Sequence, residues 1–302
     1  MDRFFALSRT THAILDLAAP AFCALLWLGH FPPWPTILLS ILTAFAAYTA
    51  VYALNDVLGI ECDLKKFDGG RISRGYSVEA SSLRHPLAQG LLSVRSGMLW
   101  MVGWFAVALL GSYALNPAIA VVLVVATALE ASYCRLQNVT PLRTLVSGLV
   151  KVSGPLAAIL VVDRQPSPML LLVVLGWLFF WEIGGQNIPS DWNYTQQDQS
   201  ANATSIPIRL GLDVAGKLVL LALCLSVAAS LLLPLVSPAP LGLPYLLVSV
   251  LLGYFLLLRP GYFLLRSKAG ALAARLFDRA SYYPFSHLIL LSLFLALDRL
   301  SH

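Results

Sequence analysis

Nine long apolar stretches alternate with short polar segments along most of the 302-residue chain. Most are about 15–22 residues long, and helices toward the upper end of this range cross about 30 Å of hydrocarbon. The pattern therefore predicts an all-α polytopic integral membrane protein, with residues 1–302 forming a single domain. The nine stretches lie near residues 13–30, 37–54, 97–115, 118–134, 144–162, 168–185, 214–236, 242–258 and 282–298.

Composition and charge agree with this prediction and add an orientation. Hydrophobic residues make up 58% of the chain and charged residues only 12%, against roughly 25% charged in an ordinary soluble domain. Of the 20 Lys and Arg residues, 17 fall in the N-terminal segment and in the loops that nine spans would place on the same side. Because cytoplasmic loops are enriched in Lys and Arg, we expect the N-terminus on the cytoplasmic side of a bacterial cytoplasmic membrane, and the C-terminus outside. The net charge of +5 is then a topology signal, and we expect no nucleic-acid partner.

Two acidic segments follow apolar stretches on this predicted cytoplasmic side. They are "NDVLGIECD" (residues 55–63) and "DWNYTQQD" (residues 191–198). Residues seven apart on an α-helix differ by about 700°, about 20° short of two full turns. The first and last Asp of each segment (Asp56 and Asp63, Asp191 and Asp198) therefore share a helix face.

Carboxylates gathered at a membrane boundary repel one another unless a cation lies among them. Oxygen ligands of this kind, with the amides of Asn55 and Asn187 nearby, suit Mg²⁺, which also binds substrate phosphates. The alternative is that the Asp and Asn residues simply cap helices and turns. Two segments with the same spacing on the same side favour the metal site.

A short pattern is shared by the segments that follow the acidic ones. Both "HPLAQG" and "IPIRLG" have a Pro and a Gly four residues apart, Pro86 with Gly90 and Pro207 with Gly211. The pattern suggests two related helix-loop-helix units. Residues 259–279 carry basic and apolar residues in helical order and predict an amphipathic helix at the headgroups.

Ionisable residues also occur inside the predicted spans. Lys151 lies at membrane depth, where an ammonium group is costly unless it is paired or hydrated, so we expect it to face a cavity and meet a phosphate or a carboxylate. Glu182 could orient Asn187 or a bound acceptor, or could pair with Lys151. Asp16 could bind the acceptor or pair with Arg9.

Taken together, these segments resemble those of the UbiA superfamily of intramembrane prenyltransferases. "NDVLGIECD" resembles the motif NDxxDxxxD, and "DWNYTQQD" resembles DxxDxxxD. Three further segments look like family anchors: "SRTTHAILDLAAP" at the start, "RHPLAQGLLS" beside RPLPSGxxS, and "TSIPIRLG" beside KTxPxxxG. The resemblance covers nearly the whole chain and is specific for the superfamily, not for a substrate.

The resemblance implies a helical bundle around a central cavity, with cytoplasmic loops over its mouth. A prenyl group would pass from an isoprenoid diphosphate to a lipophilic, often aromatic, acceptor with the help of Mg²⁺. The residues implied for the metal are Asn55, Asp63, Asp191 and Asp198, and these four with Lys151 form the expected catalytic set. The residues expected to contact the substrates are Asp56, Lys65, Arg71, Tyr133, Arg135, Arg143, Glu182 and Asn187.

The chain departs from the family pattern at several positions. Gly59 and Tyr194 stand where each acidic motif has a further Asp, and three usual basic positions are Gln137, Gln199 and Thr204. Three readings follow: compensation by nearby charges, a donor with less negative charge such as a polyprenyl phosphate lipid, or a silent lipid-binding membrane protein. A transporter is a fourth reading, because buried charges also occur there. The nearby residues that could compensate are Asp56, Glu61, Asp68, Lys65, Lys66, Arg71, Arg135, Arg143 and Lys151.

Overall fold

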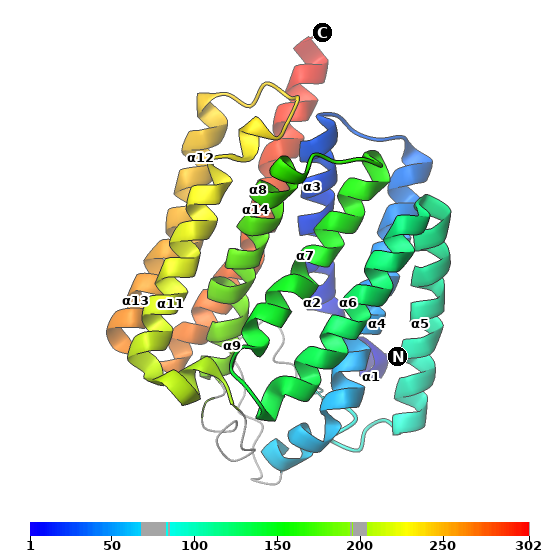
Figure 1. Ribbon diagram of the computed structural model, residues 1–302, viewed down its shortest axis with the longest axis vertical. Coiled ribbons are helices and arrows are strands. Elements are labelled where there is room, and N and C mark those ends of the chain that lie inside the picture. Colours follow the sequence, from blue (N-terminus) through cyan, green and yellow to red (C-terminus); the bar gives the residue numbers. More distant parts are fainter. Residues whose placement is uncertain (68–82, 84, 194, 196–203, 302) are drawn as a thin grey trace.

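Long helices lie side by side along the longest axis of the molecule in the computed structural model (Figure 1). The structure describes residues 1–67, 83, 85–193, 195 and 204–301, and these contain helices but no strand. The α-helices are α1 (Asp2–Leu7), α2 (Thr10–Asp16), α3 (Ala18–Leu28), α4 (Trp34–Phe67), α5 (Val94–Leu115), α6 (Pro117–Arg135), α7 (Arg143–Val162), α8 (Pro168–Trp181), α9 (Ile188–Asn193), α11 (Ile206–Ser230), α12 (Leu243–Gly253), α13 (Arg259–Ser267) and α14 (Gly270–Ser301). Two 3₁₀ turns (η1, Leu136–Asn138; η3, Leu233–Leu235) and two π-helices (η2, Glu182–Asn187; η4, Tyr254–Leu258) join some of them.

The prediction of nine spans is confirmed. Within the described residues, nine helical segments are long and apolar enough to cross a membrane. Several of them combine neighbouring helices: α2 with α3, α8 with η2 and α9, and α12 with η4 and α13. The chain is therefore an all-α polytopic integral membrane protein.

Local sequence signals mark where the helices begin and end. Asn116 separates α5 from α6, and its Oδ1 accepts a hydrogen bond from the backbone N–H of Ala118 at 3.0 Å. Pro117 then occupies the first turn of α6, where its missing N–H costs nothing. Gly29 ends α3 with φ +73°, a left-handed conformation that glycine adopts without strain.

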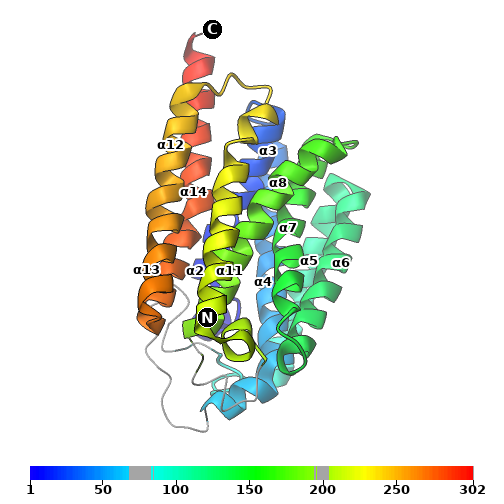
Figure 2. The same ribbon diagram turned by 60° about the vertical axis from the view of Figure 1, so that its left-hand side comes forward.

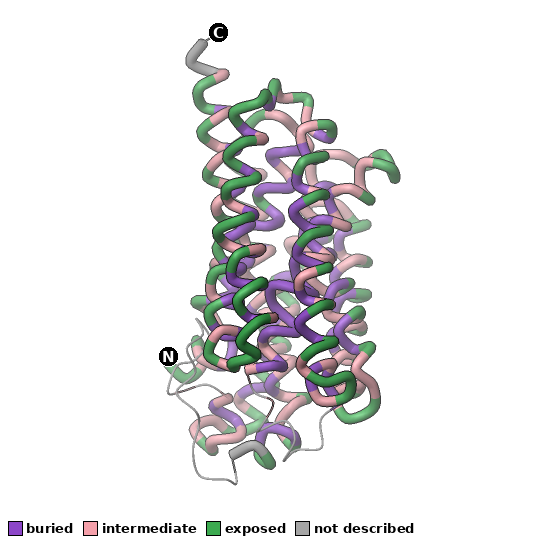
Figure 3. The backbone as a smooth tube through the Cα atoms, turned by 90° about the vertical axis from the view of Figure 1, so that its left-hand side faces the viewer, coloured by how far each residue is buried: buried purple, intermediate pink, exposed green. Residues whose placement is uncertain are grey.

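The interior and the outer surface of the bundle are both apolar, as a lipid environment requires. The largest buried cluster contains Trp177 and Trp181 of α8, Leu223 of α11 and Tyr283 of α14. Figure 3 shows that the buried parts of the chain face the interior of the bundle. Outward-facing residues such as Leu110 of α5 are exposed and face lipid. The pair α5 and α6 lies at one edge of the bundle, and α12 lies at the other (Figure 2).

The π-helix η2 fits tightly between its neighbours because two of its residues are glycines. A Cβ on Gly184 would lie 2.9 Å from both the Val219 carbonyl oxygen and the Ala222 Cβ of α11. A Cβ on Gly185 would lie 2.8 Å from the Ala280 Cβ of α14. Small residues at such contacts allow membrane helices to approach closely, and here they fix the position of Glu182 and Asn187.

Gly184→Ala is therefore expected to destabilise the protein by about 1–3 kcal/mol, the usual cost of overpacking. Gly176→Ala on α8 is the matched control, because no atom of the described residues, apart from the chain next to it in the same helix, lies within 4 Å of its Cβ position. That change should be neutral or slightly stabilising, since alanine favours helix over glycine by about 1 kcal/mol. Thermal unfolding in detergent measures both, and equal stability of the two variants would contradict the close contact.

The prediction of a headgroup helix at residues 259–279 is wrong. The helix from Leu243 continues through η4 to Ser267, and α14 begins at Gly270. Leu264, Leu276 and Phe277 of this region are buried and pack inside the bundle, whereas Tyr262 and Phe263 are about half exposed. The segment forms the end of one span and the start of the next.

The two Pro-x-x-x-Gly segments share a backbone feature. Gly90 has φ +68° and Gly211 has φ +79°, both in the left-handed region that side chains disfavour. Gly211 also places a non-helical residue within α11. The positive φ at both positions explains the glycines, and the larger repeat stays a prediction.

Candidate functional site

A cavity of about 200 Å³ lies among α2, α4, α6, α7, α14 and the segment formed by η2 and α9. Its wall includes Arg9, close along the chain to the N-terminus, which lies in the lower part of the bundle in Figure 1. Both acidic segments of the sequence reach it, since Asn55 and Asp63 line it from α4 and Asp191 lines it from α9. Residues 128 positions apart in the chain thus share one cavity, and the family resemblance had implied such a site.

Two Asp residues of the first acidic segment and a histidine of the following loop form what we term the mouth cluster, consisting of Asp56, Asp63 and His85. The Nδ1 atom of His85 lies 3.0 Å from Asp56 Oδ1 and 2.9 Å from Asp63 Oδ2. Because one ring atom contacts both carboxylates, Asp56 and Asp63 share a helix face, as the seven-residue spacing predicted. His85 was missed in the sequence, since a single histidine in a loop offers no periodic signal.

Asn55 is held by Arg9 and Glu130 at the side of the mouth cluster. Arg9 donates a hydrogen bond to Asn55 Oδ1 at 3.0 Å, and Asn55 Nδ2 donates to Glu130 Oε1 at 2.7 Å. The guanidinium of Arg9 also lies 3.8 Å from Asp56 Oδ1. Arg9 therefore belongs to this end of the cavity and does not pair with Asp16, the alternative considered from the sequence.

The second acidic segment is organised by Arg143. Its guanidinium donates to Asp191 Oδ1 at 2.5 Å and stacks over the Tyr133 ring, with 4.8 Å from the guanidinium carbon to the ring centroid. Asn187 Nδ2 donates to the Tyr133 hydroxyl at 3.0 Å. The Asn187 Oδ1 atom is buried and accepts no hydrogen bond from the described residues.

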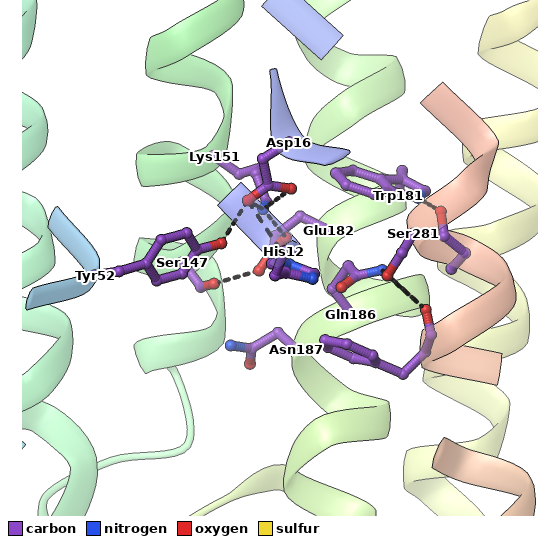
Figure 4. A network of polar contacts seen from close by, with 12 residues as sticks. His12, Asp16, Tyr52, Ser147, Lys151, Trp181, Glu182, Gln186, Asn187 and Ser281 are labelled. Carbon is purple, nitrogen blue, oxygen red and sulfur yellow. Dashed lines mark hydrogen bonds and ion pairs between the residues drawn. The ribbon is translucent and has the colours of Figure 1, made fainter. Parts of the chain in front are cut away.

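Deeper in the cavity lies what we term the inner cluster, consisting of Asp16, Lys151 and Glu182 (Figure 4). Lys151 Nζ donates to both carboxylate oxygens of Asp16 at 2.8 Å, and it lies 3.7 Å from Glu182 Oε2. Ser147 donates to Glu182 Oε1 at 2.6 Å, and the Tyr52 hydroxyl donates to Asp16. Lys151 thus faces the cavity and meets carboxylates, one of the two outcomes expected for it.

The other residues expected at the site are placed less centrally. Lys65 and Arg135 are exposed and do not line the cavity. Arg135 ends α6, where a cation interacts favourably with the helix dipole. Arg71 and Asp198 lie outside the residues that the structure describes, so their roles stay predictions.

The residues around the cavity fit a divalent metal ion. One ligand atom from each member of the mouth cluster can be chosen so that all three lie within 4.8 Å of one another. Asp56 Oδ2 and Asn187 Oδ1 are buried oxygens without a hydrogen-bond donor among the described residues. Carboxylate and amide oxygens are the ligands Mg²⁺ prefers, and an imidazole is also accepted by first-row transition metals.

Comparisons with known proteins identify the family and the fold of the chain. The family model of the UbiA prenyltransferase family matches residues 17–287. No curated protein matches the chain in sequence.

Solved structures share the fold at low sequence identity. A UbiA homolog from Archaeoglobus fulgidus bound to DMAPP and Mg²⁺ superposes with a TM-score of 0.66 at 14% identity, covering 95% of this chain and 99% of that chain. An apo UbiA homolog from Aeropyrum pernix K1 gives 0.72 at 17% identity, covering 95% and 98%. A digeranylgeranylglyceryl phosphate synthase structure gives 0.64 at 17% identity, covering 98% and 97%.

Proposed function

The chain belongs to the UbiA prenyltransferase family, and from this we propose that it transfers a prenyl group within the membrane from a prenyl diphosphate to a lipophilic acceptor. The observation that carries the proposal is the shared cavity of Asp63 and Asp191, with Arg143 beside them. Acids and a guanidinium together suit a diphosphate bound with Mg²⁺. The density of Lys and Arg near this end favours the cytoplasmic side.

We assign the mouth half of the cavity to the diphosphate and its metal. Asp63, Asp191 and the amide oxygen of Asn187 would hold Mg²⁺, with Asn55 and Asp198 as the remaining residues implied by the family motifs. When bound, Mg²⁺ supplies positive charge against the departing diphosphate. Arg9 and Arg143 line the same cavity and supply further positive charge for the phosphate oxygens.

The chemistry of the transfer is the breaking of the allylic C–O bond, with its electron pair leaving on the diphosphate. The prenyl carbon then carries positive charge until the acceptor attacks it. Rings of Tyr48, Tyr52, Tyr133 and Phe277 line the cavity, and aromatic faces attract a cation. The surrounding apolar bundle limits the access of water, which would otherwise capture the same carbon.

The proposal is tested by donor binding to the purified full-length protein in detergent or nanodiscs. Dimethylallyl and geranyl diphosphate are expected to bind with Mg²⁺ and to lose most of their affinity in EDTA, because the acids at the cavity repel the diphosphate when no metal is bound. Geraniol and geranyl monophosphate are the controls for the prenyl tail and for a singly phosphorylated donor. Absent or metal-independent binding of the diphosphates would overturn the proposal, and tight binding of the monophosphate alone would indicate a different donor.

A further inference from the structure

Three buried side-chain oxygens on the π-helix η2 lack a hydrogen-bond donor among the described residues. They are Glu182 Oε2, Gln186 Oε1 and Asn187 Oδ1, and all three residues line the cavity. A π-helix joins residues five apart by hydrogen bonds, so Glu182 and Asn187 lie one above the other on the same side. Asn187 is at the diphosphate end, whereas Glu182 and Gln186 lie deeper (Figure 4).

The surroundings of Glu182 and Gln186 leave these oxygens for a ligand. Only 6% of Glu182 and 3% of Gln186 is exposed. The amide nitrogen of Gln186 donates to the Phe277 carbonyl and to Ser281 Oγ, both at 3.2 Å, which turns its oxygen away from α14. Buried polar atoms are normally satisfied, so these oxygens are placed to accept hydrogen bonds from a molecule in the cavity.

The charge of the inner cluster restricts which molecule fits. Asp16 and Glu182 are two carboxylates against one ammonium, that of Lys151, and the neighbouring His12 ring contacts Asp16 at 3.7 Å. Counting only its three members, each in its charged form, the inner cluster carries a net charge of minus one. A second anion would be repelled in this poorly solvated region, whereas one added proton brings the cluster to zero.

We infer that the inner end of the cavity binds the acceptor as an uncharged hydroxyl compound and that Glu182 takes its proton. This inference rests on the proposed prenyl transfer. The hydroxyl oxygen forms a bond to the allylic carbon, and the O–H bond breaks with its proton passing to Glu182 Oε2. The C–O bond of the donor breaks with its electron pair leaving on the diphosphate, and the proton later returns to solvent. Gln186 Oε1 accepts a second hydrogen bond from the acceptor.

The test compares acceptor probes on the full-length protein with geranyl diphosphate and Mg²⁺. The probes are 2-naphthol, its methyl ether 2-methoxynaphthalene, and 6-hydroxy-2-naphthoate. We expect binding of 2-naphthol and formation of its geranyl ether, at least about tenfold weaker binding of the carboxylate compound, and no product from the methyl ether. A preference for the carboxylate compound, or no binding of 2-naphthol by protein that binds the donor, overturns the inference and leaves the proposed function standing. Failure of donor binding itself would instead overturn the proposed function.

Glu182→Gln separates a proton acceptor from a structural residue. Ether formation should fall by about 100-fold or more, the usual contribution of a general base, and the preference for 2-naphthol over the carboxylate compound should shrink by about tenfold. An acidic probe, 1-nitro-2-naphthol, should recover much of the lost rate because its hydroxyl ionises without a base. A purely structural role would lower all rates equally, which would overturn the assignment to Glu182.

Glu130→Gln is the matched control. It makes the same change at a buried residue that lines the cavity near the mouth cluster. Because Glu130 Oε1 already accepts from Asn55, the ratio between the two probes should stay as in the native chain. An equal shift in both variants would overturn the specific role of Glu182.

Discussion

Asp63→Ala is expected to weaken the Mg²⁺-dependent binding of geranyl diphosphate by more than about 100-fold, since changing even the outer-shell partners of a metal ligand costs about 10–100-fold. Asp63 lies in the cavity wall, and its carboxylate is the member of the mouth cluster nearest His85, at 2.9 Å. Removing it takes away both the proposed metal ligand and a negative charge that would attract the cation. Equilibrium dialysis of labelled donor over a series of Mg²⁺ concentrations measures the change.

The residual binding in EDTA provides the internal control for this variant. It should be at least as strong as in the native protein, because no metal is involved in either case and the variant lacks one carboxylate that repels the diphosphate. Asp63→Asn should show nearly the same loss, since the charge and not the shape of the side chain attracts the cation. Native-like donor affinity of Asp63→Ala at every Mg²⁺ concentration would place the metal elsewhere.

A carboxylate can also be added to the site, at Gly59, one helical turn before Asp63. Gly59 lines the cavity, and among the described residues a Cβ at this position would meet only Asp63 Oδ2, at 3.4 Å. Gly59→Asp therefore adds a carboxylate beside Asp63 without a steric clash, and the apparent affinity for Mg²⁺ should rise by on the order of tenfold, because ligand charge tunes cation affinity. Gly59→Asn adds an oxygen without the charge and should give a smaller gain.

Features that depend on one helix could be predicted from the sequence. The apolar runs identify the spans, because the length of a helix can be compared with the thickness of the bilayer without any knowledge of how the helices pack. The common face of Asp56 and Asp63 follows from the helical repeat alone. The prediction that Lys151 faces a cavity follows from the free-energy cost of an unpaired ammonium group in lipid.

Contacts between helices could not be predicted in the same way. In a membrane the outer face of a helix is as apolar as the inner face, so the pattern does not reveal which side meets which neighbour. The pairings of Arg9 with Asn55 and of Lys151 with Asp16 join residues 46 and 135 positions apart. The π-helix that begins at Glu182 also could not be predicted from the sequence. Its extra residue shifts the position of the side chains around the helix, and two glycines are its only unusual residues.

Stability depends most strongly on the inner cluster, and Lys151→Met is expected to lower the free energy of unfolding by about 3–5 kcal/mol, the usual cost of breaking a buried ion pair. Only 11% of the Lys151 side chain and 4% of the Asp16 side chain is exposed. Without the ammonium, Asp16 and Glu182 become two buried carboxylates with no cation between them. Unfolding in detergent, followed by tryptophan fluorescence, measures the loss.

Net charge decides the outcome of the matching double variant. Counting only Asp16, Glu182 and residue 151, the native inner cluster carries a net charge of minus one and Lys151→Met carries minus two, whereas Asp16→Asn with Lys151→Met returns to minus one. The double variant should therefore regain a large part of the stability lost by the single one, as coupled charges do in a double-mutant cycle. Lys217→Met removes an ammonium at an exposed position of α11 and should change stability by no more than about 0.5 kcal/mol. Equal losses for the single and double variants would show that Lys151 stabilises the fold by packing alone and not by its charge.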